Sequence, residues 1–148
     1  MSLKKLLQQG KLHAHSTSPA ELNELRRIIA RDLSDAALQA LSEDRRFATA
    51  YNAALQTAKM AIACAGYRVG SIPGHHRVSF EAAKLALGRS GAQLADYFDA
   101  CRRKRNEIDY TGAAIATTTE ADEILLHAKS FSNLVESWIA STHPALKA

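Results

Sequence analysis

Apolar residues recur every three or four positions along most of the chain, which is the spacing of one face of an α-helix. No stretch alternates between apolar and polar residues, and β-branched residues do not cluster, so no strand is expected. The pattern predicts four main helices: one beginning at Ser18-Pro19, then 43–65, 92–109, and one from 119 to 143. Two shorter helices are expected over 35–41 and 80–87. The expected fold is therefore all-α: an antiparallel four-helix bundle with one or two short extra helices.

Helix-capping residues support these boundaries. Ser18, Ser34, Ser42, Ser79 and Thr119 each stand where a predicted helix begins. The longest helix carries apolar residues at alternating steps of four and three, which predicts a seam between packed helices. The seam consists of Phe47, Tyr51, Ala54, Ala58, Ala61 and Ala65. Gly66 is expected to end this helix, and residues 67–78 are expected to form the main loop.

The chain divides into a short leading segment and one domain. Residues 1–17 are expected to be peripheral, with Leu3, Leu6 and Leu7 forming one helical turn that docks on the body. Residues 18–148 then form a single helical domain, and 148 residues in total are enough to bury a substantial core.

Composition and charge are those of an ordinary globular protein. Apolar residues make up 47% and charged residues 23% of the chain. A net charge of +4 permits contact with nucleic acid without requiring it. Cys64 and Cys101 fall in different predicted helices and have no metal-ligand spacing, so free thiols, no metal and no cofactor are expected. With no apolar run long enough for a signal peptide or membrane span, a cytoplasmic protein without membrane contact is expected.

Arg105 stands on a helix face that is otherwise apolar. Leu94, Phe98, Cys101, Arg105 and Ile108 lie within roughly 40° of one line on the predicted helix. A guanidinium keeps its charge and is rarely buried without a partner. Two explanations remain open: Arg105 pairs with Asp109 one turn further on, or it faces a ligand or a second subunit. The basic run that begins at Arg102 has a solvated helix face as its simpler explanation.

The string Arg105-Asn106-Glu107-Ile108-Asp109-Tyr110 resembles the signature of the HEPN superfamily, the small helical bundles named for nucleotide-binding in higher eukaryotes and prokaryotes. That signature is an arginine, often followed by asparagine, with a histidine further along, and Tyr110 occupies the histidine position here. Further similarity lies in the alanine-rich helix ending in Gly66-Tyr67-Arg68, the Gly74-His75-His76 loop, and the helices with Phe80 and Trp138. The resemblance covers about residues 40–142.

This resemblance implies a homodimer in which two arginine motifs share a cleft. Active members are metal-independent ribonucleases, often toxins paired with a nucleotidyltransferase-type antitoxin. Others bind RNA or nucleotides without cleaving them. In such a site Arg105 would grip phosphate oxygens and Asn106 would orient the phosphate or the arginine. The unperturbed pKa of a tyrosine hydroxyl is near 10, against about 6.5 for histidine, so a tyrosine in the histidine position would be a slow base, and catalysis is expected to be weak or lost.

His75 and His76 form a second candidate group with Arg68 and Arg77. In a glycine-flanked loop they could supply the missing base or hold a phosphate, or they could simply be surface residues. Three hypotheses follow. The first is a HEPN-like dimer that binds RNA or a nucleotide at Arg105 and Asn106. The second is an active endoribonuclease toxin with His75 or His76 as its base. The third is a protein-interaction module that binds a partner through the alanine-rich seam.

Overall fold

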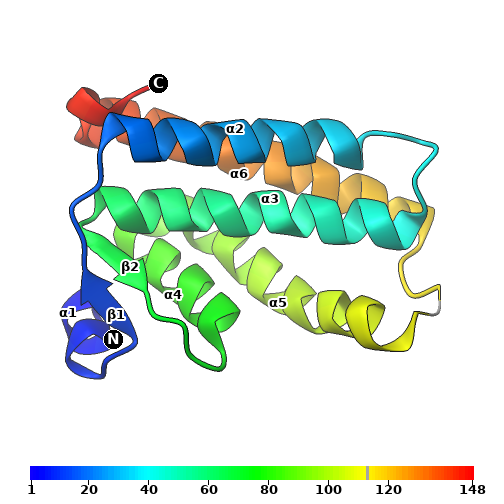
Figure 1. Ribbon diagram of the computed structural model, residues 1–148, viewed down its shortest axis with the longest axis horizontal. Helices are drawn as coiled ribbons and strands as arrows, with labels where there is room; N and C mark the ends of the chain where they lie inside the picture. The colour runs from blue at the N-terminus through cyan, green and yellow to red at the C-terminus, as the bar shows by residue number, and fades with distance from the viewer. Residues whose placement is uncertain (113) are drawn as a thin grey trace.

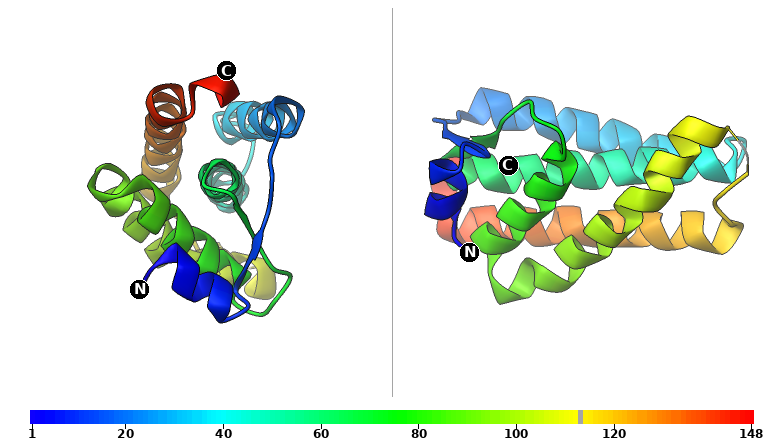
Figure 2. Two further views of the ribbon diagram at one scale, coloured as in Figure 1. Left: turned by 90° about the vertical axis from the view of Figure 1, so that its left-hand side faces the viewer. Right: turned by 90° about the horizontal axis from the view of Figure 1, so that it is seen from below.

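Helix α3, Glu43–Cys64, runs through the centre of the computed structural model, which describes residues 1–112 and 114–148 (Figures 1 and 2). The surrounding helices are α2 (Pro19–Ala36), α4 (His75–Leu87), α5 (Arg89–Thr111) and α6 (Thr118–Thr142). Because α3 touches neighbours on several sides, 14 of its 22 residues are buried. The expected all-α bundle is confirmed. Figure 1 shows α2, α3 and α6 lying side by side, whereas α5 crosses α3 obliquely.

Hydroxyl side chains begin three of the long helices. Ser18, Ser42 and Thr117 each accept a hydrogen bond from the backbone amide three residues further on. Thr117 forms a reciprocal capping box with Glu120, so the cap of α6 lies two residues before the predicted cap at Thr119. At the other end, α6 stops at Thr142, and a 3-10 turn over Pro144–Leu146 follows.

Two predicted boundaries were wrong. The short helix expected over 35–41 does not form, because Leu33 and Ala36 continue the apolar face of α2 and the helix runs through Ser34. The loop expected over 67–78 is much shorter, because α4 begins at His75 rather than at Phe80. Ser79 is therefore inside a helix, where its hydroxyl donates to the carbonyl oxygen of His75.

A small antiparallel sheet corrects the expectation that no strand forms. Strand β1 (Leu12–Ala14) pairs with strand β2 (Tyr67–Val69), so that Leu12 lies opposite Val69. Three residues are too few to show an alternating pattern in the sequence. Through this pairing residues 1–17 join the body, and α1 (Leu3–Gln8) places Leu6 in the core beside Leu12, both fully buried.

The alanine seam of α3 is packed against other parts of the same chain. Tyr51, Ala54, Ala58 and Ala61 are 0% exposed, and Phe47 is 2% exposed. Their small side chains let neighbouring helices approach α3 closely. These five side chains are therefore packed within the chain, and the third hypothesis, a protein-interaction module, stays a prediction.

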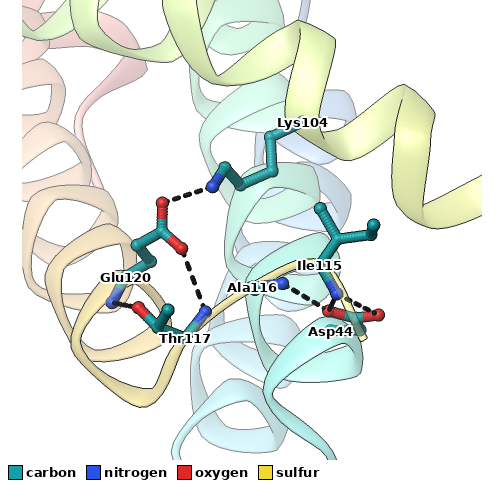
Figure 3. A network of polar contacts seen from close by, with 6 residues as sticks. All are labelled: Asp44, Lys104, Ile115, Ala116, Thr117 and Glu120. Carbon is teal, nitrogen blue, oxygen red and sulfur yellow. Dashed lines mark hydrogen bonds and ion pairs between the residues drawn. The ribbon is translucent and has the colours of Figure 1, made fainter. Parts of the chain in front are cut away.

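Side chains from α3 and α5 contact the residues at the start of α6 and just before it (Figure 3). The carboxylate of Asp44, at the start of α3, accepts hydrogen bonds from the backbone amides of Ile115 (3.0 Å) and Ala116 (2.7 Å). Lys104 of α5 forms an ion pair with Glu120, the capping-box residue of α6. Lys104 thus links the carboxyl-terminal half of α5, which carries Arg105, to the start of α6, and Asp44 links the residues just before α6 to α3.

Candidate anion-binding site

Arg105 lies between the protein interior and the surface. Its side chain is 25% exposed and forms an ion pair with Asp109 one helical turn further on. The guanidinium also lies over the aromatic ring of Tyr51, with Cζ 5.9 Å from the ring centroid. Among the described residues Nε of Arg105 is buried and has no hydrogen-bond partner. The arginine thus makes the pair with Asp109 and still has unused donor capacity.

Tyr51 connects α3 to the first turn of α4. Its hydroxyl lies 3.2 Å from Nδ1 of His76, and Tyr51 itself is 0% exposed. The structure gives this buried hydroxyl no other acceptor among the residues that it describes. A buried hydroxyl that donates to nothing is costly, so Tyr51 donates its proton to Nδ1 of His76. The neutral ring of His76 therefore carries its own proton on Nε2.

The surroundings keep both groups uncharged at neutral pH. Burial raises the pKa of Tyr51 well above its ordinary value, although Arg105 and Arg102 oppose that shift. Burial, His75, Arg105, Lys59 and Arg102, in that order, lower the pKa of His76 to about 4. His76 is therefore a neutral hydrogen-bond donor through Nε2 rather than a cation.

Positive charge exceeds negative charge around this pair. Lys59 of α3 and Arg102 of α5 both act on His76, and Arg102 is only weakly paired, with Nε 3.4 Å from Asp99. The first turn of α4 contains no acidic residue that would offset the positive end of the helix. We call Tyr51, His76, Arg102 and Arg105 the Tyr51 cluster. Its donors and cations suit an anion with several oxygen atoms, such as a phosphate.

Two shallow hollows flank the cluster along α3. One, of about 390 Å³, is lined by Arg45 and Ala48 of α3 and by Ile108 and Asp109 of α5. The other, of about 380 Å³, includes Lys59 and His75 in its lining. A ligand longer than a single phosphate group would find space on either side of the cluster.

Asn106 and Tyr110 lie apart from the cluster. Both are exposed, Tyr110 by 89%. Positions one and five residues after Arg105 point about 100° and about 140° away from it on a helix, whereas Asp109 is only about 40° away. Helical geometry therefore separates Tyr110 from Arg105 within one chain.

The structure separates the two histidines of the second candidate group from its two arginines. His75 is exposed and its ring centroid lies 4.4 Å from that of His76, so both histidines belong to the same helix start. Arg77 is exposed and borders a polar hollow between α4 and α5, together with Glu81 and Lys84. Arg68 lies on β2 in a different pocket, beside His15 and Glu21. Neither arginine joins the Tyr51 cluster.

Sequence reasoning missed Tyr51 and Lys59 as site residues. Tyr51 was assigned only to the helix seam, yet it brings a hydroxyl group into a row of alanines. A buried hydroxyl requires a partner, and that requirement was the available signal. Lys59 gave no signal, because its position depends on how β2 and the following loop fold back over α3.

The described part of the chain contains no group of three His, Cys, Asp or Glu side chains placed to hold a metal ion. No described helix is both long enough and apolar enough to cross a membrane. Comparison of the chain with models of protein families, with curated proteins and with solved structures found no match. The HEPN resemblance therefore stays a prediction.

Proposed function

We propose that this protein is a HEPN-like helical bundle that binds RNA or a nucleotide by its phosphate groups at the Tyr51 cluster. The observation that carries the proposal is the orientation of His76 by Tyr51 beside Arg105. A phosphate would accept hydrogen bonds from the guanidinium of Arg105 and from Nε2 of His76, with Arg102 adding charge. Asn106 is assigned a supporting contact with a longer ligand, since it lies on the exposed side of α5.

The cluster favours binding over catalysis. A general base needs a free nitrogen lone pair, and Nδ1 of His76 already accepts the proton of Tyr51. Tyr110 is 89% exposed and lies far around the helix from Arg105. Within one chain, then, neither His76 nor Tyr110 is a good base beside the arginine, which supports weak or lost catalysis.

The quaternary part of the proposal rests on the resemblance. A homodimer would bring two Arg105 side chains to a shared cleft and would change the surroundings of the exposed Asn106 and Tyr110. A nucleotidyltransferase-type antitoxin is the proposed partner. A cytoplasmic location is proposed as well, in keeping with the free thiols of Cys64 and Cys101.

The test is fluorescence anisotropy with a labelled single-stranded RNA and, separately, with a labelled nucleoside triphosphate. Arg105→Gln should weaken binding by about tenfold or more, since hydrogen bonds to charged groups contribute about 1.5–3 kcal/mol. Arg103→Gln is the matched control: it removes the same charge from an exposed position of the same helix, and it should weaken binding less than threefold. Equal losses in both variants, or no binding by the wild type, would refute the proposal.

An endoribonuclease with His75 as its base is the second candidate. It is favoured by the 4.4 Å ring separation that places the exposed His75 next to His76. Cleavage would require His75 to accept the 2′-hydroxyl proton as the 2′-oxygen attacks phosphorus, Arg105 to stabilise the phosphorane charge, and solvent water to protonate the 5′-oxygen that leaves. RNA incubated with the wild type would then be cut, and His75→Gln would stop the cutting while leaving RNA binding within threefold. Intact RNA after prolonged incubation removes this candidate.

A further inference from the structure

A largely apolar pocket is lined by residues of α2, α3 and β2. Its volume is about 360 Å³. The apolar part of the wall comes from three elements: Leu25 of α2, Ile62 and Ala63 of α3, and Tyr67 and Val69 of β2. The lining also contains three polar residues that are at least partly exposed, namely His15, Glu21 and Arg68. It is separate from the Tyr51 cluster, since none of the four cluster residues lines it.

Lys59 is the unusual member of this lining. Its side chain is partly buried, and burial lowers the pKa of its ammonium group. In the described ranges no carboxylate lies within ion-pair distance of it. An ammonium group that loses water without gaining a counter-charge is unfavourable, so an anion at this position would stabilise the protein.

Glu21, the carboxylate in the lining of this pocket, already has other partners. Glu21 lies 2.8 Å from Nε2 of His15 and accepts a hydrogen bond from Thr17 at 2.7 Å. Both contacts hold the pKa of Glu21 below its ordinary value, with Thr17 the larger cause. Glu21 is therefore held by residues of the segment between β1 and α2, and no carboxylate of the described residues pairs with Lys59.

We propose that this pocket binds a small organic anion with an apolar body, namely a medium-chain or aromatic carboxylate, whose carboxylate group pairs with the ammonium of Lys59. The apolar body lies against Leu25, Ile62 and Val69, and the ring of Tyr67 forms one wall. A volume of about 360 Å³ is within the usual range for a small-molecule pocket. Lys59 also lines the hollow beside the Tyr51 cluster, but the ligand of this pocket contains no phosphate, so failure of octanoate binding and failure of phosphate binding can be told apart.

The probes are octanoate and 1-octanol, which share an apolar chain but differ in charge. Isothermal titration of the full chain should give saturable binding of octanoate at least tenfold tighter than that of 1-octanol. Lys59→Met keeps the apolar stem of the side chain and should reduce octanoate affinity about tenfold, with 1-octanol unchanged. Lys129→Met, which removes the same charge from an exposed site on α6, should leave both affinities within twofold.

A second variant tests the location. Ala63 lines the pocket and is 6% exposed, so Ala63→Leu should fill the cavity and reduce the binding of both probes at least tenfold. Circular dichroism of each variant establishes that the helices are retained. Equal affinity for the two probes, octanoate binding that survives Lys59→Met, or no saturable octanoate binding by the wild type would each overturn the proposal.

Discussion

The hydroxyl group of Tyr51 and Nδ1 of His76 form a 3.2 Å hydrogen bond between the central helix α3 and the first turn of α4. Because Tyr51 is completely buried, this bond determines which nitrogen of His76 carries the proton. Arg105 of α5 lies over the same tyrosine ring. One aromatic side chain thus positions both a neutral donor and a cation, and this relationship is the physical basis of the proposed phosphate site.

Tyr51→Phe removes the hydroxyl and keeps the ring under Arg105. We expect the free energy of unfolding to fall by about 1 kcal/mol, the typical value of one hydrogen bond, and RNA binding to weaken several-fold because His76 is no longer oriented. Urea denaturation and anisotropy measure the two effects. Tyr110→Phe removes the same group from an exposed residue and should change neither. If the two variants behave alike, Tyr51 has no positioning role.

Acid should destabilise the protein in a window set by His76. The pKa of His76 is about 4 in the folded protein, against an ordinary 6.5 in the unfolded chain. Between these values the unfolded chain binds the proton and the folded protein does not, so stability falls as the pH decreases from 6.5 to 4. The loss should be on the order of 2 kcal/mol, after allowance for the partial exposure of the ring.

Urea denaturation at pH 7 and at pH 4.5 tests this expectation in His76→Gln, where the amide oxygen can still accept from Tyr51. The variant should lose clearly less stability than the wild type between the two pH values. His75→Gln, the exposed neighbour, should keep the wild-type dependence. If His76→Gln loses as much stability as the wild type between the two pH values, groups other than His76 cause the acid destabilisation.

Arg46 should be much more important for stability than its ion-pair partner. It is 3% exposed, donates from Nε to the carbonyl oxygen of Ala36 at 2.9 Å, and pairs with Asp122 at 2.7 Å. Arg46→Met leaves that carbonyl without its partner and should cost about 3 kcal/mol. Asp122 is 58% exposed, so Asp122→Asn should cost less than about 1 kcal/mol. Thermal or urea unfolding of the two variants measures these losses of stability. Comparable losses in both would contradict the expected difference between Arg46 and Asp122.

Asp44 should hold the connection between α5 and α6. Asp44→Ala removes the acceptor of two backbone amides, and we expect a loss of about 1–3 kcal/mol together with faster hydrogen exchange at Ile115 and Ala116. The side chain of the neighbouring Glu43 accepts one hydrogen bond from the described residues, that of the exposed Thr118 hydroxyl at 3.2 Å. Glu43→Ala is therefore the control, with an expected loss below about 0.5 kcal/mol. Unchanged hydrogen exchange at these two amides in Asp44→Ala would show that Asp44 does not hold this segment in place.

The bundle was predictable because long amphipathic helices repeat their pattern several times. The range 43–65 predicted α3 to within one residue at its end, since the Ser42 cap and Gly66 enclose an uninterrupted apolar seam. The two strands were not predictable, because three residues each carry no periodic signal and their pairing joins segments more than fifty residues apart. The start of α4 was misplaced because Ser79 resembles a cap, although the helix already begins after Gly74.

The candidate site was predictable only in part. Arg105 stood out because a cation interrupts an apolar stripe, and its pairing with Asp109 follows from a spacing of four residues. The contact between His76 and Tyr51 depends on how α4 packs on α3, which no local pattern encodes. Five helical positions place Tyr110 on another face of α5 from Arg105, at 89% exposure, so the role implied by the Arg-to-Tyr spacing stays a prediction.

In the proposed site, Tyr51 orients the neutral ring of His76 so that its proton is on Nε2 and can be donated to a phosphate beside Arg105. Nitrogen-15 NMR of the histidine rings during titration with a short single-stranded RNA tests it most directly. At pH 7 the wild type should show the Nε2–H form of His76, and its signals should move with RNA in the wild type and in Arg103→Gln but not in Arg105→Gln. A His76 ring protonated on Nδ1 would contradict the account, as would His76 signals that do not shift although the RNA binds.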